Sequence, residues 1–192
     1  FTTQSDVTLL KVFARLQSKG TAYVDCIQLE KQPTASRYNL IENGEFTQAG
    51  STTAAPYGWN PGNGSWVDLN DGRKAPGLNT KMYTIQGDPN KNMRLLQNVS
   101  AQGKAGDVYS LGGWAIGNFV PTTDEGRMFG IIGQFNYKDG TSKQVKVNFN
   151  SDLKNDLVWQ YACERMVAEK EYTSITVLLA FDHDANQVWF DG

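Results

Sequence analysis

Short runs of alternating apolar and polar residues follow one another along most of this chain. From residue 80 onward, such runs span residues 80–86, 93–99, 108–116, 128–137, 145–149, 158–166, 173–181 and 188–190. The segments between them have turn chemistry, as in Gly87-Asp88-Pro89-Asn90 and Lys138-Asp139-Gly140-Thr141. Alternation with a period of two indicates half-buried strands. Eight or nine short strands at this spacing predict an all-β fold, an antiparallel β-sandwich of the jelly-roll type.

The same alternation assigns one face of several strands to the core. Residues two positions apart lie on the same side of a strand. The side that carries the apolar residues is the one that faces the core. The predicted core residues are Phe129, Ile131, Phe135, Val145, Val147, Phe149, Ile175, Val177, Leu179 and Phe181. Only residues 164–171 have helical leanings, and a strand followed by a turn fits them equally well.

The beginning of the chain is similar in sequence to its end. Without gaps, residues 7–26 align with residues 173–192, pairing Ala14 with Ala180 and Asp25 with Asp191. Both copies read as strand, turn and strand, and the second strand closes on an aromatic residue, an apolar residue and Asp. Similarity at a fixed offset is typical of tandem modules. The alternative is two unrelated hairpins with generic alternation.

The repeat predicts a division of the chain into three parts. Residues 1–30 are the closing hairpin of a preceding, similar module, residues 31–36 are a linker, and residues 37–192 are a jelly-roll module without its own last strand. A missing strand leaves backbone groups without partners. We therefore expect the leading hairpin to fill that place, within its chain, in a strand-swapped homodimer or against a neighbouring module.

Composition excludes several classes of partner. The net charge is −2 and no run of Lys or Arg occurs, so a nucleic-acid partner is not expected. No stretch approaches the roughly 20 apolar residues of a membrane span, and we expect no membrane insertion. The 19 Gly, 5 Trp and 8 Tyr are typical of a β-rich secreted or surface protein. Cys26 and Cys163 allow one disulfide, but two buried free thiols are the simpler interpretation.

The sequence gives little support for catalysis, and we predict a protein that is not an enzyme. The single histidine, His183, lies in a predicted turn, which is a poor place for an oriented, partly buried base. A glycosidase needs two carboxylates that flank a sugar, and spacing singles out no pair. A glycan-cleaving enzyme remains a third alternative, with these candidate carboxylates: Glu42, Glu45, Asp68, Asp71, Asp107, Asp124 and Glu125.

A long loop with aromatic residues is the best candidate for a binding site. Residues 47–79 are rich in Gly, Pro, Thr, Ala and Asn, and loops of this length are usually functional. Aromatic rings can stack on the apolar face of a sugar. We predict ligand binding by Tyr57, Trp59, Trp66 and Tyr83, with a core role as the alternative for Trp59 and Trp66. Trp114 and Trp159 lie within strand patterns and are predicted core residues.

Several stretches of the sequence resemble a known family. The motif Asn39-Leu40-Ile41-Glu42-Asn43-Gly44-Glu45-Phe46, followed by Pro56-Tyr57-Gly58-Trp59, resembles the opening of a galactose-binding-like jelly roll of the carbohydrate-binding-module type. Gly113-Trp114-Ala115 and the closing strand at residues 23–30 fit the same pattern. Similar modules occur in tandem in large bacterial surface proteins of the wall-associated, RHS/YD-repeat type.

The resemblance implies a function, a location and a metal. It implies a carbohydrate-binding or adhesion-like module, secreted or cell-wall-associated, whose partner is a polysaccharide or cell-surface glycan; the alternative is a structural spacer that binds no ligand. Many relatives carry a structural Ca²⁺ where the first strand meets the last, which by position implies Glu45 and Asp191 as ligands. An Asp-Asp pair of the family is replaced here by Asp191-Gly192, which departs from that pattern.

Overall fold

The computed structural model describes residues 39–50, 55–60, 81–118, 120, 126–150 and 158–192, and the backbone of residues 65–68. The chain divides into two compact units, Phe1–Asn39 and Leu40–Gly192. The predicted leading hairpin, the linker and the swapped strand lie outside the described residues. The fold below is that of the second unit.

Nine strands make up the described part of this unit. They are β1 (Ser65–Asp68), β2 (Lys81–Gln86), β3 (Asn92–Val99), β4 (Val108–Asn118), β5 (Met128–Tyr137), β6 (Ser142–Asn148), β7 (Gln160–Val167), β8 (Tyr172–Asp182) and β9 (Gln187–Asp191). No described residue belongs to a helix, and so none forms a helix long and apolar enough to cross a membrane. The eight runs expected from the sequence correspond to β2 through β9. Residues 164–171 end β7 and then turn, which confirms the strand-and-turn alternative.

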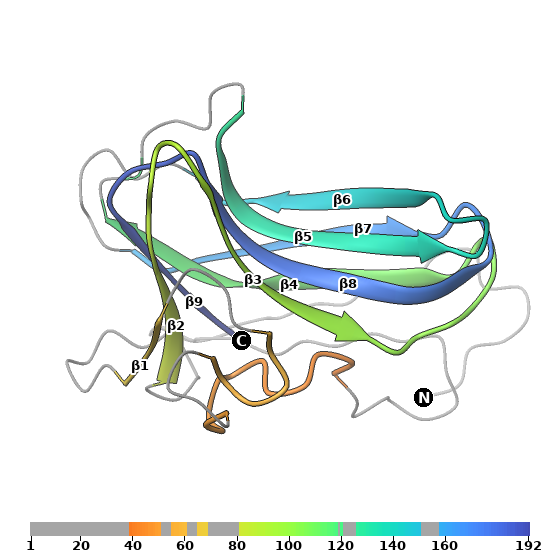
Figure 1. Cartoon of the computed structure of the whole chain (residues 1–192), viewed down its shortest axis with the longest axis horizontal. Coiled ribbons are helices and arrows are strands. Elements are labelled where there is room, and N and C mark those ends of the chain that lie inside the picture. The colour runs from red at the N-terminus through yellow and green to blue at the C-terminus, as the bar shows by residue number, and fades with distance from the viewer. Residues whose placement is uncertain are drawn as a thin grey trace, which may run out of the picture. The chain divides into compact units, whose positions relative to one another are not determined.

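The strands form two sheets that are antiparallel throughout. One sheet has the order β1-β2-β9-β4-β7 and the other the order β3-β8-β5-β6. In Figure 1 the four-stranded sheet lies toward the viewer, with β3 lowest and β6 highest. Two antiparallel sheets packed face to face confirm the predicted β-sandwich.

The core between the sheets is built from the alternating residues that the sequence indicates. Phe129 and Phe135 on β5 are fully buried, as is Phe181 on β8. Nine of the ten predicted core residues are buried, and Val145 is half-buried against the same cluster. Phe129 contacts three further rings, with centroid distances of 5.2 Å to Phe149, 5.9 Å to Phe181 and 5.8 Å to Phe190.

A second apolar cluster lies on the outer face of the five-stranded sheet. Ile116 and Trp189 are register partners, and the residues next to them, Ala115 and Phe190, belong to the main core. Ile116 and Trp189 therefore point to the opposite face. The half-buried Trp159 packs against this cluster rather than in the main core where its pattern had placed it. Trp114, also a predicted core residue, is only half-buried on that outer face.

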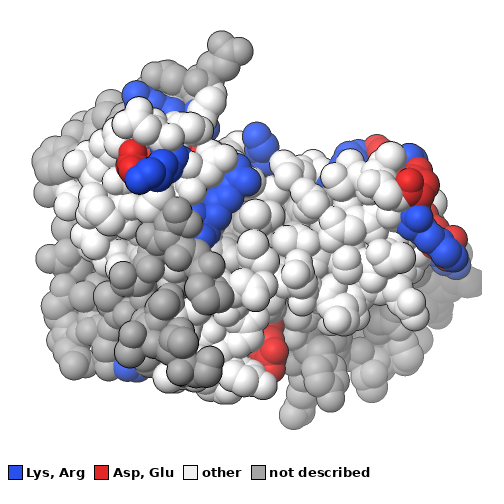
Figure 2. Space-filling view, viewed as in Figure 1, with Lys and Arg blue, Asp and Glu red and all other residues white. Residues whose placement is uncertain are grey.

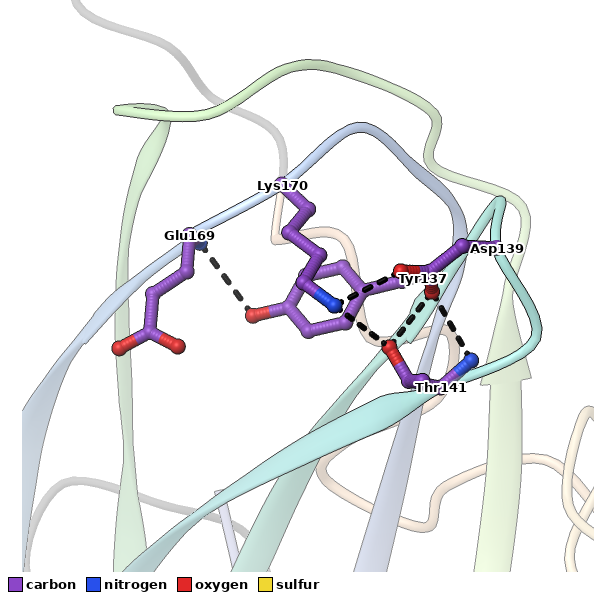
Figure 3. A network of polar contacts seen from close by, with 5 residues as sticks. All are labelled: Tyr137, Asp139, Thr141, Glu169 and Lys170. Carbon is purple, nitrogen blue, oxygen red and sulfur yellow. Dashed lines mark hydrogen bonds and ion pairs between the residues drawn. The ribbon is translucent and has the colours of Figure 1, made fainter.

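A polar clasp fastens the β5–β6 turn to the β7–β8 connection (Figure 3). Lys170 Nζ lies 2.7 Å from Asp139 Oδ2 and 3.1 Å from Thr141 Oγ1, and 5.5 Å from the centre of the Tyr137 ring. The backbone N–H of Glu169 donates to the Tyr137 hydroxyl at 3.2 Å. Since β5 and β7 belong to different sheets, the clasp joins the two sheets at one end of the sandwich.

Candidate functional site

The opening motif forms a tight turn that is tied to the following loop. Asn43 adopts a positive φ of 54°, which Asn tolerates better than most residues. Its side chain donates to the carbonyl oxygens of Gln48 (3.0 Å) and Tyr57 (2.9 Å) and accepts from the N–H of Gln48 (3.0 Å). From β3, the buried Gln97 amide exchanges two 2.8 Å hydrogen bonds with the backbone of Glu42 and donates to the Gly58 carbonyl at 3.1 Å.

The structure separates the four aromatic residues that were predicted to bind a ligand. Trp59 is 7% exposed, donates its Nε1–H to the Asn43 carbonyl at 3.2 Å, and packs on Phe46. Tyr83 is fully buried in the core. Neither ring offers a broad exposed face on which a sugar could stack, because the core already packs against both. Tyr57 is 50% exposed and is free to contact a ligand. Trp66 pairs with Tyr83 through the backbone, and its side chain lies outside the described residues.

Of the two residues implied as calcium ligands, Asp191 is buried and is affected by the negative charge of Glu45. Asp191, on β9, is 3% exposed; its Oδ1 accepts from the Gly192 N–H at 2.9 Å. Its Oδ2 is buried and has no hydrogen-bond partner among the described residues. Burial, with a smaller contribution from the negative charge of Glu45, raises the pKa of Asp191 to about 7. A buried carboxylate oxygen without a donor, near a second carboxylate, suits a hard cation. Among the described residues, however, no three His, Cys, Asp or Glu side chains gather to hold a metal.

The outer face of the four-stranded sheet carries a row of amides and hydroxyls. In antiparallel sheets, register partners point to the same face. The register aligns Asn98, Thr176, Gln134 and Gln144 across all four strands, and Ser174 and Asn136 in the next position. Their neighbours along the strands, such as Phe135 and Ile175, are buried in the core, so these six point outward. We call them the amide row: Asn98, Gln134, Asn136, Gln144, Ser174 and Thr176.

The members of the amide row hold one another by hydrogen bonds. Gln144 Nε2 donates to Gln134 Oε1 at 2.7 Å, and Gln134 Nε2 donates to Asn136 Oδ1 at 2.8 Å. Asn136 Nδ2 in turn donates to Ser174 Oγ and Thr176 Oγ1, both at 3.0 Å. Thr176 Oγ1 completes the chain by donating to Asn98 Oδ1 at 3.0 Å. Each amide retains donor or acceptor capacity that this chain of bonds does not use.

An apolar strip runs beside the amide row. Leu96, Leu178 and Ile132 are register partners on the same face, with Lys146 at the end of their line on β6. One line further on, Arg94 forms a bidentate ion pair with Asp182, with Nε–Oδ1 at 2.9 Å and Nη2–Oδ2 at 2.5 Å. Figure 2 shows that this side of the molecule is largely free of charged residues between its two ends. The face is therefore a mixed polar and apolar surface with little net charge.

The loop with Tyr57 lies along the edge of this face. The N–H of Asn60 donates to the Leu96 carbonyl at 2.9 Å, and Asn60 and Leu96 form an isolated antiparallel bridge. Since β3 is an edge strand of the four-stranded sheet, the bridge extends that sheet by a short piece of the loop. Tyr57 lies three residues before Asn60 in the same loop and is 50% exposed. The loop therefore carries an exposed aromatic ring beside the β3 edge of this face.

Comparisons with known proteins show similarity to solved structures only. No family model matches the chain, and no curated protein matches it. A structure of a family 16 carbohydrate-binding module (module 2) is 21% identical with a TM-score of 0.52, over 80% of this chain and 96% of that chain. The enzymatically active domain of tailspike protein 4 from bacteriophage CBA120 is 10% identical with a TM-score of 0.53, over 80% of this chain and 20% of that chain.

Another similar structure is a family 61 carbohydrate-binding module, TmCBM61, in complex with β-1,4-galactotriose. It is 20% identical with a TM-score of 0.48, over 80% of this chain and 94% of that chain. Identities at this level establish architecture rather than ligand. Together with the two antiparallel sheets, the comparisons show that the chain has the jelly-roll β-sandwich fold found in carbohydrate-binding modules.

Proposed function

We propose that this jelly roll is a non-catalytic carbohydrate-binding module that holds a glycan on the amide row. The observation that carries the proposal is the row itself, in which hydrogen bonds join six amide and hydroxyl side chains on the outer face of the four-stranded sheet. Sugar hydroxyls both donate and accept, as amides and hydroxyls do. The fold supports the proposal, because a family 16 carbohydrate-binding module has the same architecture.

The neighbouring features suit the other surface of a sugar. In the apolar strip, Leu96 and Leu178 are half-buried and offer contact for C–H groups beside the hydrogen-bonding row, whereas Ile132 is only 1% exposed. Tyr57 adds an exposed aromatic ring on the loop at the β3 edge. Strands lie about 4.8 Å apart, so a row across four strands is about 14 Å long, enough for a short oligosaccharide. The proposed partner is therefore a polysaccharide or cell-surface glycan that lies across the strands.

The test combines glycan-array screening with titration calorimetry on the glycans that bind. Gln134→Ala and Gln144→Ala each remove amide hydrogen bonds worth about 1 kcal/mol, and we expect affinity to fall about 5-fold for each. Gln86→Ala is the matched control, because it removes an exposed glutamine of the other sheet. If glycans bind and both row variants bind as well as the control, the site is elsewhere. If no glycan binds, the spacer that binds no ligand is the better interpretation.

The proposal includes a structural Ca²⁺ ion at Asp191 and Glu45. It is supported by the buried Oδ2 of Asp191, which lacks a donor among the described residues, and by the nearby charge of Glu45. Backbone carbonyls and water would supply the remaining oxygen ligands that Ca²⁺ requires. We expect CaCl₂ to raise the melting temperature of the protein relative to EDTA, and Asp191→Asn to abolish that difference. An equal melting temperature in CaCl₂ and EDTA would exclude the site.

The proposal also places the module in an exported bacterial surface protein. It is supported by the composition, with 19 Gly and 13 Trp and Tyr residues (5 + 8) and 2 Cys, and by the resemblance of the opening motif to wall-associated modules. Fractionation of cells that produce the parent protein, followed by immunoblotting, tests it. Recovery of the protein in the cytoplasmic fraction alone would contradict it.

A further inference from the structure

A tight turn in the loop beside β3 presents the exposed Tyr57 at its tip. The N–H of Trp59 donates to the carbonyl of Pro56 at 3.2 Å, and Gly58 has a φ of 80°. This hydrogen bond, together with a positive φ at the third residue, is typical of a type II β-turn, which favours glycine at that position. Tyr57 is the second residue of the turn. We call residues 56–60 the tyrosine turn.

Two polar side chains hold the tip of the tyrosine turn. Asn43 Nδ2 donates to the Tyr57 carbonyl at 2.9 Å, and Gln97 Nε2 donates to the Gly58 carbonyl at 3.1 Å. Gln97 is 3% exposed, and its amide also exchanges two 2.8 Å hydrogen bonds with the backbone of Glu42. The Gln97 amide is therefore fixed in one orientation, with a donor aimed at the turn.

The last two residues of the tyrosine turn attach it to the sheet. Trp59 is buried and packs on Phe46, and the N–H of Asn60 donates to the Leu96 carbonyl at 2.9 Å. Bridge partners in an antiparallel pair point to the same face, so Asn60 shares the outer face of the sheet with Leu96. Asn60 is exposed, and its side chain forms no hydrogen bond within the described part of the chain. Tyr57 and Asn60 are thus the side chains that this anchored backbone offers to a ligand.

We propose that Tyr57 and Asn60 form the β3 end of the glycan site, and that Gln97 is the positioning residue that holds them there. This inference deepens the proposed function and rests on it, since it concerns the glycan that the amide row binds. The Tyr57 ring offers a face to the C–H groups of a sugar, and the Asn60 amide can both donate to and accept from its hydroxyls. The turn extends the binding face beyond β3 by about one strand spacing, about 4.8 Å.

The anchoring of the tyrosine turn gives it value as a binding element. Ordering a loop on binding costs free energy, and a backbone that is already fixed in the bound conformation avoids that cost. Gln97 joins the turn to the rest of the site, because on β3 it lies between Leu96 of the apolar strip and Asn98 of the amide row. Its loss should therefore weaken glycan binding through Tyr57 and Asn60.

Titration calorimetry with the glycans that bind on an array tests this end of the site. Tyr57→Ala should weaken binding about 10-fold and Asn60→Ala about 5-fold, whereas Tyr57→Phe keeps the ring and should bind as the wild type does. Tyr161→Ala is the matched control, because it removes a ring that is 59% exposed on β7 of the other sheet. If the amide-row variants weaken binding but Tyr57→Ala and Asn60→Ala bind as the control does, the proposed function stands and this inference is overturned. If no glycan binds, both are overturned.

A double-mutant cycle tests the positioning role of Gln97. Gln97→Met fills a similar volume without the three hydrogen bonds of the amide. It should weaken binding about 10-fold in the wild type but less than about 2-fold in the Tyr57→Ala/Asn60→Ala background, where no turn side chain is left to position. A general loss of structure would weaken binding equally in both backgrounds, and that result would overturn the positioning role.

A second variant keeps the test sharp if Gln97→Met does not fold. Asn43→Gly removes the side chain that bonds to Tyr57 and Gln48, and glycine accepts the φ of 54° at that position without strain. It should weaken binding by the same route, with little further loss when Tyr57→Ala/Asn60→Ala is added. The amide of Asn60 should also exchange faster with solvent in this variant without glycan. An unchanged affinity in Asn43→Gly would overturn the requirement for an anchored turn.

Discussion

The replacement of Asp191 by Asn should stabilise the metal-free protein, although it alters a buried polar group. In the folded chain the pKa of Asp191 is raised to about 7, from an ordinary value of 3.8, mainly because the carboxyl is buried and secondly because Glu45 is negative. Asn keeps an oxygen that can accept from the Gly192 N–H, and its NH₂ group takes the place of the unpartnered Oδ2. The buried charge disappears and the hydrogen bond stays.

The sign and the size of the effect follow from proton linkage. Since the folded pKa lies above the unfolded pKa, the folded state binds the proton more tightly, and wild-type stability falls as pH rises from about 4 to 7. The difference between 3.8 and about 7 corresponds to about 4 kcal/mol. Because the effective dielectric constant at buried sites is higher than that of a dry interior, we take about half of this value, about 2 kcal/mol. The stability gained by Asp191→Asn should therefore be near zero at pH 4 and about 2 kcal/mol at pH 8.

Urea unfolding at pH 4, 6 and 8 in EDTA measures this gain directly. Asp139→Asn is the control, because Lys170 lowers the pKa of Asp139, so removal of that charge should destabilise at neutral pH. If Asp191→Asn is less stable than the wild type at pH 8 in EDTA, or if the difference does not change with pH, the burial argument for Asp191 is refuted. With CaCl₂ present, the proposed ion should instead favour the wild type.

Three further substitutions test the packing of the sandwich. Phe129→Ala opens a cavity at a fully buried site in contact with three other rings, and urea unfolding should show a loss of about 4 kcal/mol; a loss below 1 kcal/mol would contradict this packing. Arg94→Met leaves Asp182, whose side chain is 5% exposed, without its bidentate partner. The free energy of unfolding should fall by about 3 kcal/mol, because a buried charge is left unpaired. The double variant Arg94→Met/Asp182→Leu removes that charge and should recover most of the loss. Tyr172→Phe removes a buried hydroxyl with hydrogen bonds of 2.6 and 3.1 Å and should cost about 1 kcal/mol in the same assay; an unchanged midpoint would show these bonds to be neutral.

The strands could be predicted from the sequence because each one carries its own signal. Phe129, Ile131 and Phe135 lie two or four positions apart, which places them on one face, and the run that contains them coincides with β5 at both ends. The burial of the aromatic residues depends on contacts with residues that are distant in the sequence. Trp59 follows a Gly in a polar loop, yet it is buried, because it packs on Phe46 and donates its indole N–H to the carbonyl of Asn43, 16 positions earlier. No pattern within the loop carries that information.

The amide row could not be assembled from sequence for a similar reason. Gln134 and Asn136 alternate with Phe135 and Tyr137, which indicates only that they point outward. Gln144 comes 10 positions after Gln134, and Thr176 comes 40 after Asn136. Their meeting depends on the register of three strand pairs, which turns and core packing fix together. A search for polar residues at outward positions of neighbouring strands would be the signal to use.

The clasp between Lys170, Asp139, Thr141 and Tyr137 has a consequence for how the sandwich comes apart. It binds the turn of one sheet to the connection that leads from β7 to β8, where the chain crosses between the sheets. This corner cannot open strand by strand, because the Glu169 amide and the Lys170 ammonium are held by the same hairpin. The corner therefore opens as a single cooperative unit, and the amides of Thr141 and Glu169 should exchange with solvent at the same free energy of opening.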